Sequence, residues 1–174
     1  MSNPMRNIRI AKLTLNIGTG KDEEKLKKGM KLLATLSGVK IIKAFTVKKI
    51  PGWGVRPGLP LGCKTTIRGK AIEPLLRRLL NAKSNKLPKS CFDDFGNISF
   101  GLEEYINIPE MKYDPAIGMM GLEASLTLER PGFRVKRRRI KPAKITSRHK
   151  IKKEDAIAFM QSAFGIKVTE RGSE

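Results

Sequence analysis

The chain has 174 residues, with 36 Lys or Arg against 16 Asp or Glu, a formal net charge of +20. Its length predicts one domain over residues 1–174, and an apolar content of 40% argues against a disordered chain. A lone histidine and two cysteines without Cys-x-x-Cys spacing argue against a zinc site or disulfide framework, and without a long apolar run or a signal-peptide core we expect a soluble, cytoplasmic protein.

The chain begins with a predicted strand and helix. Residues 8–17 alternate between apolar and polar side chains, which is typical of a half-buried strand. A glycine turn at residues 18–20 ends this strand, and a helix is expected over residues 22–37, with acidic residues in its first turn and Gly38 as its stop signal. The inward positions of this helix are Leu26, Met30, Leu33 and Ala34.

Two more strands are predicted on either side of a long connection. Residues 39–47 are rich in β-branched and aromatic side chains, which favours a strand. Residues 48–62 are so rich in Pro and Gly that we expect a long loop or an extended hairpin tip. A third strand is expected over residues 62–69, where Cys63 lies on the apolar side and is interpreted as a small core residue.

The middle of the chain contains one predicted helix and several strands. The helix covers residues 71–83, with Pro74 in its first turn, where proline is tolerated. A loop follows at residues 84–90, and one or two strands lie within residues 95–108. Residues 121–129 and 133–140 are predicted to be the two arms of a second hairpin.

The chain closes with a linker at residues 141–148 and an amphipathic helix at residues 152–164. Because strands outnumber helices and are often joined by hairpins, the predicted fold class is α+β. We expect an antiparallel sheet with helices packed on one face and the other face open.

The polar side of the first and third strands is the candidate binding surface. It carries amino, guanidinium, hydroxyl and amide groups, which suit phosphates and riboses. A merely solvated sheet face is the alternative, but the absence of acids among these positions favours binding. The residues are Lys12, Thr14, Asn16, Lys64, Thr66 and Arg68.

Charge is distributed unevenly along the chain. Residues 1–90 hold 21 basic and 4 acidic side chains, residues 91–130 hold 2 and 8, and residues 131–174 hold 13 and 4. Such an excess of positive charge predicts a polyanionic partner, and nucleic acid is a better match than an anionic membrane. The acidic middle predicts a face turned away from that polyanion, towards solvent or a basic partner.

Enzymatic motifs are absent from the sequence. The segment Gly18-Thr19-Gly20-Lys21 fits neither the dinucleotide-binding nor the phosphate-loop pattern, and acids follow it, so a tight turn before a capped helix is expected. No nucleophile pairs with His149, and no catalytic or metal-binding residue is predicted. A basic RNA-modifying enzyme remains the alternative function.

Two further basic segments are candidates for RNA contact. In the Pro/Gly-rich loop, Trp53 either stacks on a base or folds back onto its own loop, and the residues favour neither. Its basic neighbours are Lys48, Lys49 and Arg56. The second segment is a run near the C-terminus that favours phosphate contact over a solvated strand end, formed by Arg134, Lys136, Arg137, Arg138 and Arg139.

Several segments together resemble a universal ribosomal protein family. These are RIAKLTLNIGTG, GVKIIKAFTVKKIPGWGVRPGLPLGCKTTIRG and FDDFGNISFGLEEYINIPEMKYDP, which fall within about residues 6–128. The family is the large-subunit protein that binds 5S ribosomal RNA, numbered five in bacteria and eleven in eukaryotes. The tail over about residues 129–165, with ERPGFRVKRRR and KEDAIAFM, resembles an extension of the archaeal and eukaryotic branch.

The resemblance implies a structural protein of the central protuberance, present as a monomer and without cofactor. The implied partners are 5S rRNA, large-subunit rRNA, peptidyl-site tRNA, neighbouring ribosomal proteins and a protein of the small-subunit head. The family's RNA-contacting positions fall on Lys12, Asn16, Thr66 and Arg68, and its tRNA-contacting loop, which also joins an intersubunit bridge, corresponds to residues 46–56. The full predicted rRNA-binding set is Lys12, Thr14, Asn16, Lys43, Lys64, Thr66 and Arg68.

Overall fold

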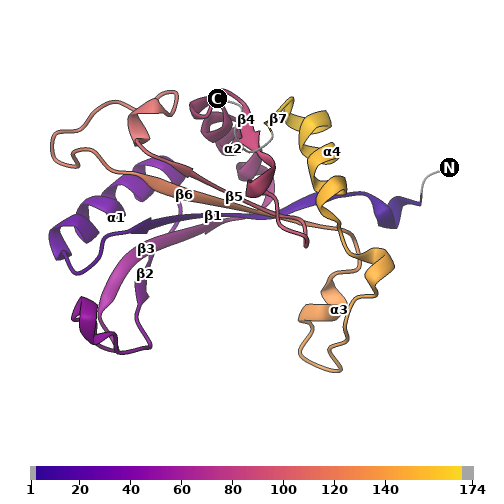
Figure 1. Cartoon of the computed structure of the whole chain (residues 1–174), viewed down its shortest axis with the longest axis horizontal. Helices are drawn as coiled ribbons and strands as arrows, with labels where there is room; N and C mark the ends of the chain where they lie inside the picture. Colours follow the sequence, from indigo (N-terminus) through magenta and orange to yellow (C-terminus); the bar gives the residue numbers. More distant parts are fainter. Residues whose placement is uncertain (1–2, 170–174) are drawn as a thin grey trace.

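A five-stranded, fully antiparallel sheet forms the centre of the molecule (Figure 1). The computed structural model describes residues 3–169. In spatial order the strands are β2 (Ile42–Phe45), β3 (Pro60–Ile67), β1 (Arg9–Gly18), β6 (Leu122–Glu129) and β5 (Asn97–Leu102).

Three helices lie above one face of this sheet in Figure 1, which confirms the predicted α+β class with one face left uncovered by them. They are α1 (Glu23–Ser37), α2 (Ile72–Ala82) and α4 (Lys153–Phe164). A single helical turn, α3 (Arg134–Arg137), lies on the opposite side. The remaining strands, β4 (Lys86–Pro88) and β7 (Lys167–Thr169), form a separate parallel pair.

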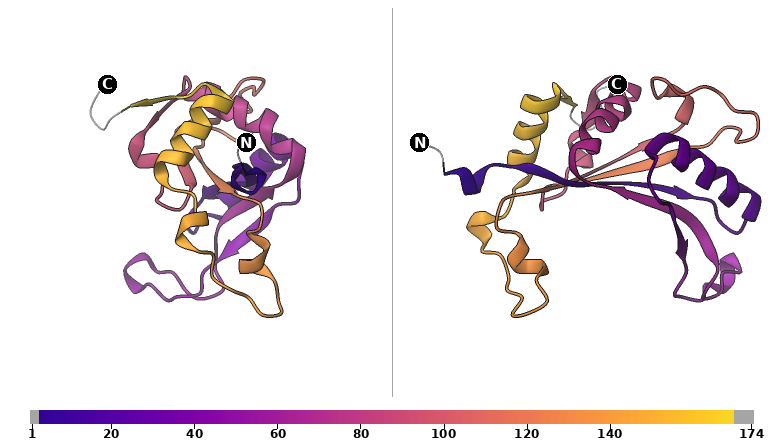
Figure 2. Two further views of the ribbon diagram at one scale, coloured as in Figure 1. Left: turned by 90° about the vertical axis from the view of Figure 1, so that its right-hand side faces the viewer. Right: turned by 180° about the vertical axis from the view of Figure 1, so that it is seen from behind.

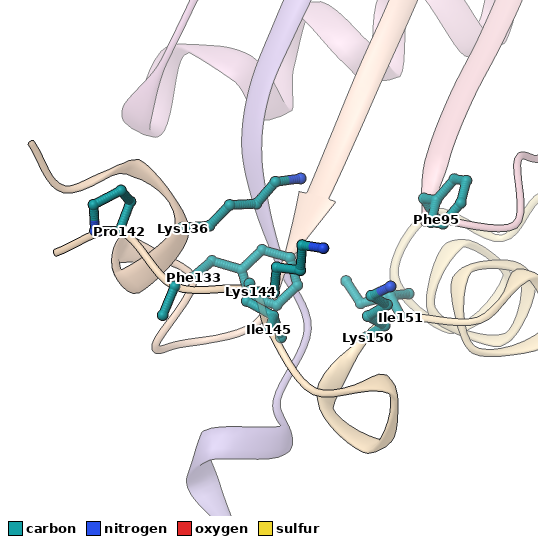
Figure 3. Close-up of a pocket in the computed structure, with 9 residues that line it drawn as sticks. Phe95, Phe133, Lys136, Pro142, Lys144, Ile145, Lys150 and Ile151 are labelled. Carbon is teal, nitrogen blue, oxygen red and sulfur yellow. The ribbon is translucent and has the colours of Figure 1, made fainter.

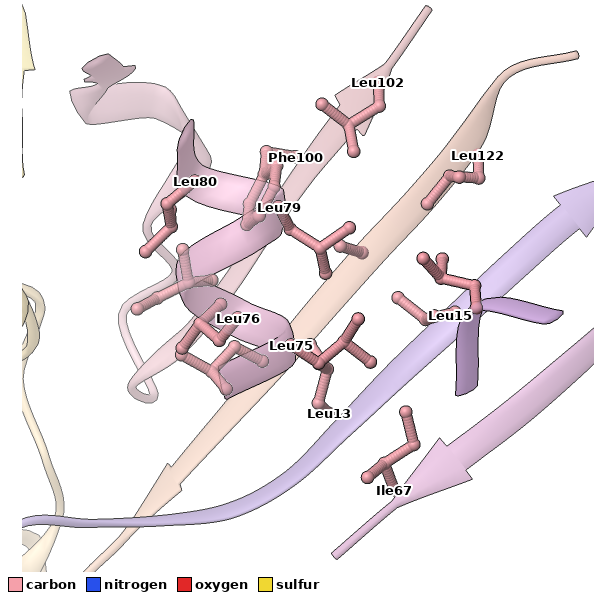
Figure 4. Packing of buried hydrophobic residues seen from close by; sticks show 14 of the residues in the cluster. Leu13, Leu15, Ile67, Leu75, Leu76, Leu79, Leu80, Phe100, Leu102 and Leu122 are labelled. Carbon is pink, nitrogen blue, oxygen red and sulfur yellow. The ribbon is translucent and has the colours of Figure 1, made fainter. Parts of the chain in front are cut away.

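The core lies between the sheet and the helices because β1 alternates as predicted. Leu13, Leu15 and Ile17 are buried on the helix side, and Figure 4 shows Leu13 beside Leu75 of α2. Opposed residues of an antiparallel pair point to the same side of the sheet. The partner of Ile17 is Cys63, which is fully buried, as expected of a small core residue.

Helix α1 begins and ends close to the predicted bounds, but its buried stripe differs. Gly38 follows the helix in the left-handed conformation, with φ of +61°. The buried side chains include Leu33, while Met30 is half-buried and Ala34 is exposed. The stripe runs through Leu26, Gly29, Leu32, Leu33 and Leu36. The turn before α1 forms as predicted, although the Asp22 side chain makes no capping hydrogen bond and pairs with Lys25 at 2.9 Å instead.

Several strands differ from their predicted bounds. The second strand is only Ile42–Phe45, an edge strand with largely exposed side chains, and the third runs over Pro60–Ile67. Within residues 95–108 there is one strand, Asn97–Leu102. The segment 84–90, predicted as loop, contains β4, which pairs with a strand near the end of the chain. Such a long-range pairing leaves no local signal in the sequence.

The predicted second hairpin is wrong. Strand β6 forms as expected, but residues 133–140 contain the helical turn α3 and loop rather than a returning strand. Both edges of β6 are already occupied, one by β1 and the other by β5, so no edge is left for a neighbouring hairpin arm. The basic residues of 133–140 are therefore not bound into the sheet.

Candidate nucleic-acid interface

The sheet face opposite the helices carries a row of hydroxyl groups. Thr14 is paired with Thr66 on one side and with Ser125 on the other, and Ser125 is paired with Ser99. Because paired residues point to the same side, four hydroxyls cross the strands β3, β1, β6 and β5 in one line. The Oγ atoms of Ser99 and Ser125 are 3.1 Å apart. We call this polar side of the sheet the open face.

A second row of the open face mixes charges. Lys64 is paired with Asn16, and Asn16 is paired with Glu123 of β6. The Asn16 Nδ2 donates to the Glu123 Oε2 over 3.3 Å. The first and third strands alone carry no acid on this face, but the β1–β6 pairing adds Glu123, which lies more than a hundred positions from Asn16 in the sequence.

A third row joins Lys12 to Thr127 and Asn97. A β-bulge between Ile10 and Lys12 precedes this row and sets which side Lys12 takes. The open face therefore continues across β6 and β5 with hydroxyl and amide groups that sequence reasoning missed. The alternation of polar residues in 121–129 was the sequence signal for these groups. It assigns them to the open face only when the pairing of β6 with β1 is known.

The predicted rRNA-binding residues do not all share this face. Arg68 lies just past the end of β3 with an extended backbone, so it continues the alternation of Lys64 and Thr66 and is exposed. Lys43 differs, since its partner in the sheet is Cys63, whose side chain points to the helices. Lys43 is exposed at the sheet edge on the side opposite the open face. The predicted residues on the open face are Lys12, Thr14, Asn16, Lys64, Thr66 and Arg68.

The connection between β2 and β3 is an extended hairpin tip. Ile50 and Val55 exchange two backbone hydrogen bonds of 3.0 Å, and a short turn of 3-10 helix, Pro51–Trp53, lies between them. Val55 is buried, whereas Trp53 is 70% exposed. Trp53 therefore does not fold back onto its own loop, and its indole is accessible together with the exposed side chains of Lys48, Lys49 and Arg56.

Glu129 anchors the basic segment 131–149 to the sheet. Its carboxylate binds the Arg9 guanidinium at 2.7 Å and also pairs with Arg137 of α3. Arg138 donates its Nε to the Lys141 carbonyl oxygen over 2.7 Å. Two members of the predicted phosphate-binding run are thus engaged inside the protein, Arg137 by β6 and Arg138 by its own segment. Among the residues that the structure describes, the other members form no ion pair; they are Arg134, Lys136 and Arg139.

The open face, the hairpin tip and the basic segment 131–149 lie on the same side of the sheet. In Figure 1 the hairpin tip descends below the sheet at the left and the segment with α3 descends at the right, while α1, α2 and α4 lie above. The right-hand view of Figure 2 shows the same arrangement from behind. The open face therefore lies between two projecting basic segments.

The acidic segment 91–130 does not form the single outward face that its composition suggested. Several of its carboxylates neutralise basic residues of the same chain. Lys31 of α1 binds Asp114 at 2.7 Å, and this hydrogen bond is the main cause that lowers the pKa of Asp114 below its ordinary value of 3.8. Glu110 pairs with Arg78, and Glu123 and Glu129 lie on the side of the open face.

The described residues 3–169 hold no candidate metal site, and the thiols of their two cysteines are not activated. No cluster of three or more His, Cys, Asp or Glu side chains lies close enough to hold a metal ion in this part of the chain. Burial raises the thiol pKa of both Cys63 and Cys91, which leaves less of the reactive thiolate. Within the same described residues, no helix has the length and apolar character to cross a membrane.

Comparison with known proteins gives one consistent result. Residues 3–56 match the model of the family "Ribosomal protein L5", and residues 60–159 match the model of the C-terminus of the same ribosomal family. The chain is 50% identical to "Large ribosomal subunit protein uL5" of Nanoarchaeum equitans, covering 97% of this chain and 99% of that protein. Proteins of the same name from Sulfurisphaera tokodaii and Methanococcoides burtonii are 44% and 39% identical, again over 97% of this chain and over 96% and 99% of theirs.

Proposed function

Because the chain belongs to the ribosomal protein L5 family, a structural and non-enzymatic class of the large ribosomal subunit, we propose that its open face binds 5S ribosomal RNA. Membership of this family makes the protein a ribosome-associated, rRNA-associated constituent of the cytoplasmic ribosome and removes the alternative of an RNA-modifying enzyme. The finer assignment to 5S RNA rests on the resemblance of residues 6–128 and on the chemistry of the open face.

The observation that carries the proposal is a polar face that α1, α2 and α4 leave uncovered. Its row of hydroxyls suits the 2′-hydroxyls of a shallow RNA groove, which donate and accept hydrogen bonds. Lys12, Lys64 and Arg68 supply positive charge along the same face, and none of them forms an ion pair with another described residue. Protein cations without an internal partner are free to replace the counterions of phosphates.

The hairpin tip is proposed to reach the peptidyl-site tRNA and a protein of the small-subunit head. Its chemistry supports both kinds of contact. Trp53 offers an exposed aromatic ring for stacking beside three exposed cations. At the base of the tip, Phe45 at the end of the edge strand and Val47 just after it expose apolar surface, which suits a protein neighbour.

The segment 131–149 is proposed to contact phosphates of ribosomal RNA through the three members of its basic run that have no internal partner. Its anchoring by Glu129 supports this role, since the segment is held on the side of the open face and does not need to be ordered by RNA alone. Neighbouring ribosomal proteins complete the proposed surroundings, in which the chain acts as a single copy.

Two matched variants test the open face. Lys64→Ala and Arg68→Ala are each expected to weaken binding of transcribed 5S RNA, because one charge-assisted contact is worth roughly 1.5–3 kcal/mol. Lys43→Ala is the matched control, since Lys43 is exposed in the same sheet but on the other side. Affinities are measured by filter binding at one fixed salt concentration, and circular dichroism verifies that each variant is folded.

The proposal fails if Lys64→Ala and Arg68→Ala bind 5S RNA as tightly as the unmodified chain. It also fails if Lys43→Ala loses as much affinity as Lys64→Ala, because the loss then reflects net charge and not the face.

A further inference from the structure

A pocket of about 410 Å³ opens where the basic segment 131–149 meets the start of β5 (Figure 3). Two phenylalanines line it, Phe95 from the turn before β5 and Phe133 from the start of the basic segment, and Ile151 contributes a buried apolar side chain. This volume is in the range of about 300–1,000 Å³ that is usual for small-ligand sites. None of the lining residues is acidic.

The aromatic rings of the pocket are held in place and yet accessible. Phe95 is 62% exposed, although the next residue, Gly96, is buried against Ile151 so closely that a Cβ there would lie 2.9 Å from the Ile151 Cγ2. Phe133 packs beside His149 with ring centroids 5.9 Å apart, and the His149 Nε2 is 2.8 Å from the Pro131 carbonyl oxygen. Phe133 is thus held beside another ring, and Phe95 is displayed by a closely packed turn.

Three lysines converge on the same pocket. Lys136, Lys144 and Lys150 all line it, and in Figure 3 their amino groups lie between Phe133 and Phe95. The Nζ of Lys150 is 5.8 Å from the centroid of the Phe95 ring, within the range of a cation–π contact. No ion pair in the described part of the chain involves any of these lysines.

The pocket is continuous with the open face. Phe95 lies two residues before Asn97, which begins β5 and belongs to the row of Lys12 and Thr127. The backbone of Gly96 accepts a hydrogen bond from the Leu128 N–H over 3.1 Å, so the mouth of the pocket and the end of β6 are tied together. A polyanion on the open face therefore passes the pocket at the end of the sheet.

We propose that this pocket binds one unpaired nucleotide of the RNA that lies on the open face, with the base against Phe95 and Phe133 and its phosphate among the three lysines. The inference deepens the proposed function and rests on it. An apolar peptide would leave three ammonium groups without partners, and a free anion would leave the two aromatic rings unused. A nucleotide satisfies both, because every base has a face for stacking and each phosphate is anionic.

Three RNA hairpins of one sequence provide the test. The first has a single unpaired 2-aminopurine, the second has an abasic residue at the same place, and the third is fully paired. A short series of these hairpins moves the unpaired position along the stem. At the best position the unmodified chain is expected to bind the 2-aminopurine hairpin at least about fivefold more tightly than the abasic one, the lower end of the range for stacking on an aromatic side chain. Its fluorescence should change on binding.

Phe95→Ala is expected to remove this preference without changing affinity for the paired hairpin. The matched control is Tyr113→Ala, which removes an exposed aromatic ring from the 103–121 connection. Lys150→Ala should weaken binding of the unpaired and abasic hairpins alike, since both keep the phosphate. The proposal is overturned if the unmodified chain binds the 2-aminopurine and abasic hairpins equally at every position. It is also overturned if Phe95→Ala keeps the preference for the unpaired base.

The same hairpins separate this inference from the proposed function. If Lys64→Ala weakens binding of 5S RNA while no hairpin shows a preference for the unpaired base, the open face stands and the pocket fails. If the preference exists and depends on Phe95 but both Lys64→Ala and Arg68→Ala bind 5S RNA normally, the proposed function fails, and with it the placement of the bound nucleotide in an RNA that lies on the open face.

Discussion

Glu123 places a carboxylate among the cationic, hydroxyl and amide groups of the open face. It accepts a hydrogen bond from Asn16, so part of its charge is offset within the protein. A phosphate is still repelled beside Glu123, and we expect the RNA backbone to contact that row only at its other end, at Lys64 on β3, and otherwise to follow the rows that contain Thr14 and Lys12. At the scale of single residues, some positions on the open face therefore favour a phosphate more than others do.

Two glycines in strands make opposite predictions for stability. A Cβ on Gly62 would lie 2.5 Å from the Ile17 carbonyl oxygen, so Gly62→Ala forces the backbones of β3 and β1 apart. We expect it to lower the free energy of unfolding by about 1–3 kcal/mol, the usual cost of overpacking. Gly101→Ala is the control, because a Cβ there meets nothing within 4 Å. It should be neutral or slightly stabilising, since alanine restricts the unfolded chain.

Urea denaturation followed by circular dichroism measures both variants. An unchanged midpoint for Gly62→Ala would show that the close approach of the two backbones relaxes at no cost.

Among the elements, the β2–β3 hairpin and the segment 131–149 reach the open side by different means. The hairpin is an extension of the sheet, and its tip is closed by the Ile50–Val55 bridge. The other segment has no strand partner and is held by side chains, above all by Glu129 with Arg9 and Arg137. Only the first is an independent structural unit that can be shortened without disturbing the sheet.

Shortening the hairpin tip tests the division of roles between elements. Residues 48–56 are replaced by Asn-Gly, a pair that favours tight hairpin turns. Thr46 still bonds to Gly58 and Leu59 through backbone hydrogen bonds of 2.9 and 3.0 Å, so β2 and β3 should remain paired. We expect 5S RNA affinity within about twofold of the unmodified chain, by filter binding, and weaker retention of peptidyl-site tRNA on reconstituted ribosomes. Loss of 5S RNA binding would contradict this division.

At the scale of the molecule, cations without internal partners from three parts of the chain lie on the same side of the sheet. The open face carries three cations without internal partners, and the hairpin tip and the basic run 134–139 each add three more on the same side. These nine are Lys12, Lys64, Arg68, Lys48, Lys49, Arg56, Arg134, Lys136 and Arg139. Two acids of the segment 91–130, Glu110 and Asp114, pair with cations of α2 and α1 and not with any of these nine.

Salt dependence measures how much of this arrangement 5S RNA uses. Each phosphate neutralised on a duplex contributes about −0.9 to the slope of log affinity against log salt concentration. A complex that uses the open face alone should give a slope of about −3, and one that engages all nine cations a slope of about −8. Replacing the hairpin tip should leave the slope for 5S RNA unchanged. A slope shallower than about −2 would contradict phosphate binding by the open face.

Much of the fold follows from local patterns in the sequence. The alternation of residues 8–17, the glycine after α1 and the leucine spacing of α2 each constrain a few neighbouring residues, and these elements form near the predicted bounds. The same alternation separates Leu13 and Leu15 from Lys12 and Thr14, which is why one side of β1 was known before its partners were. The resemblance to a ribosomal family also depended on sequence alone and was confirmed.

The tertiary structure alone decided which strands are neighbours. Pairing of β1 with β6 joins residues more than a hundred positions apart, and it brings Glu123, Ser125 and Thr127 onto the open face. The same kind of pairing turned Lys43 to the other side and left residues 133–140 without a strand partner. Backbone hydrogen bonds between strands are alike for almost every residue type, so a strand's own sequence determines its two sides but not its neighbours.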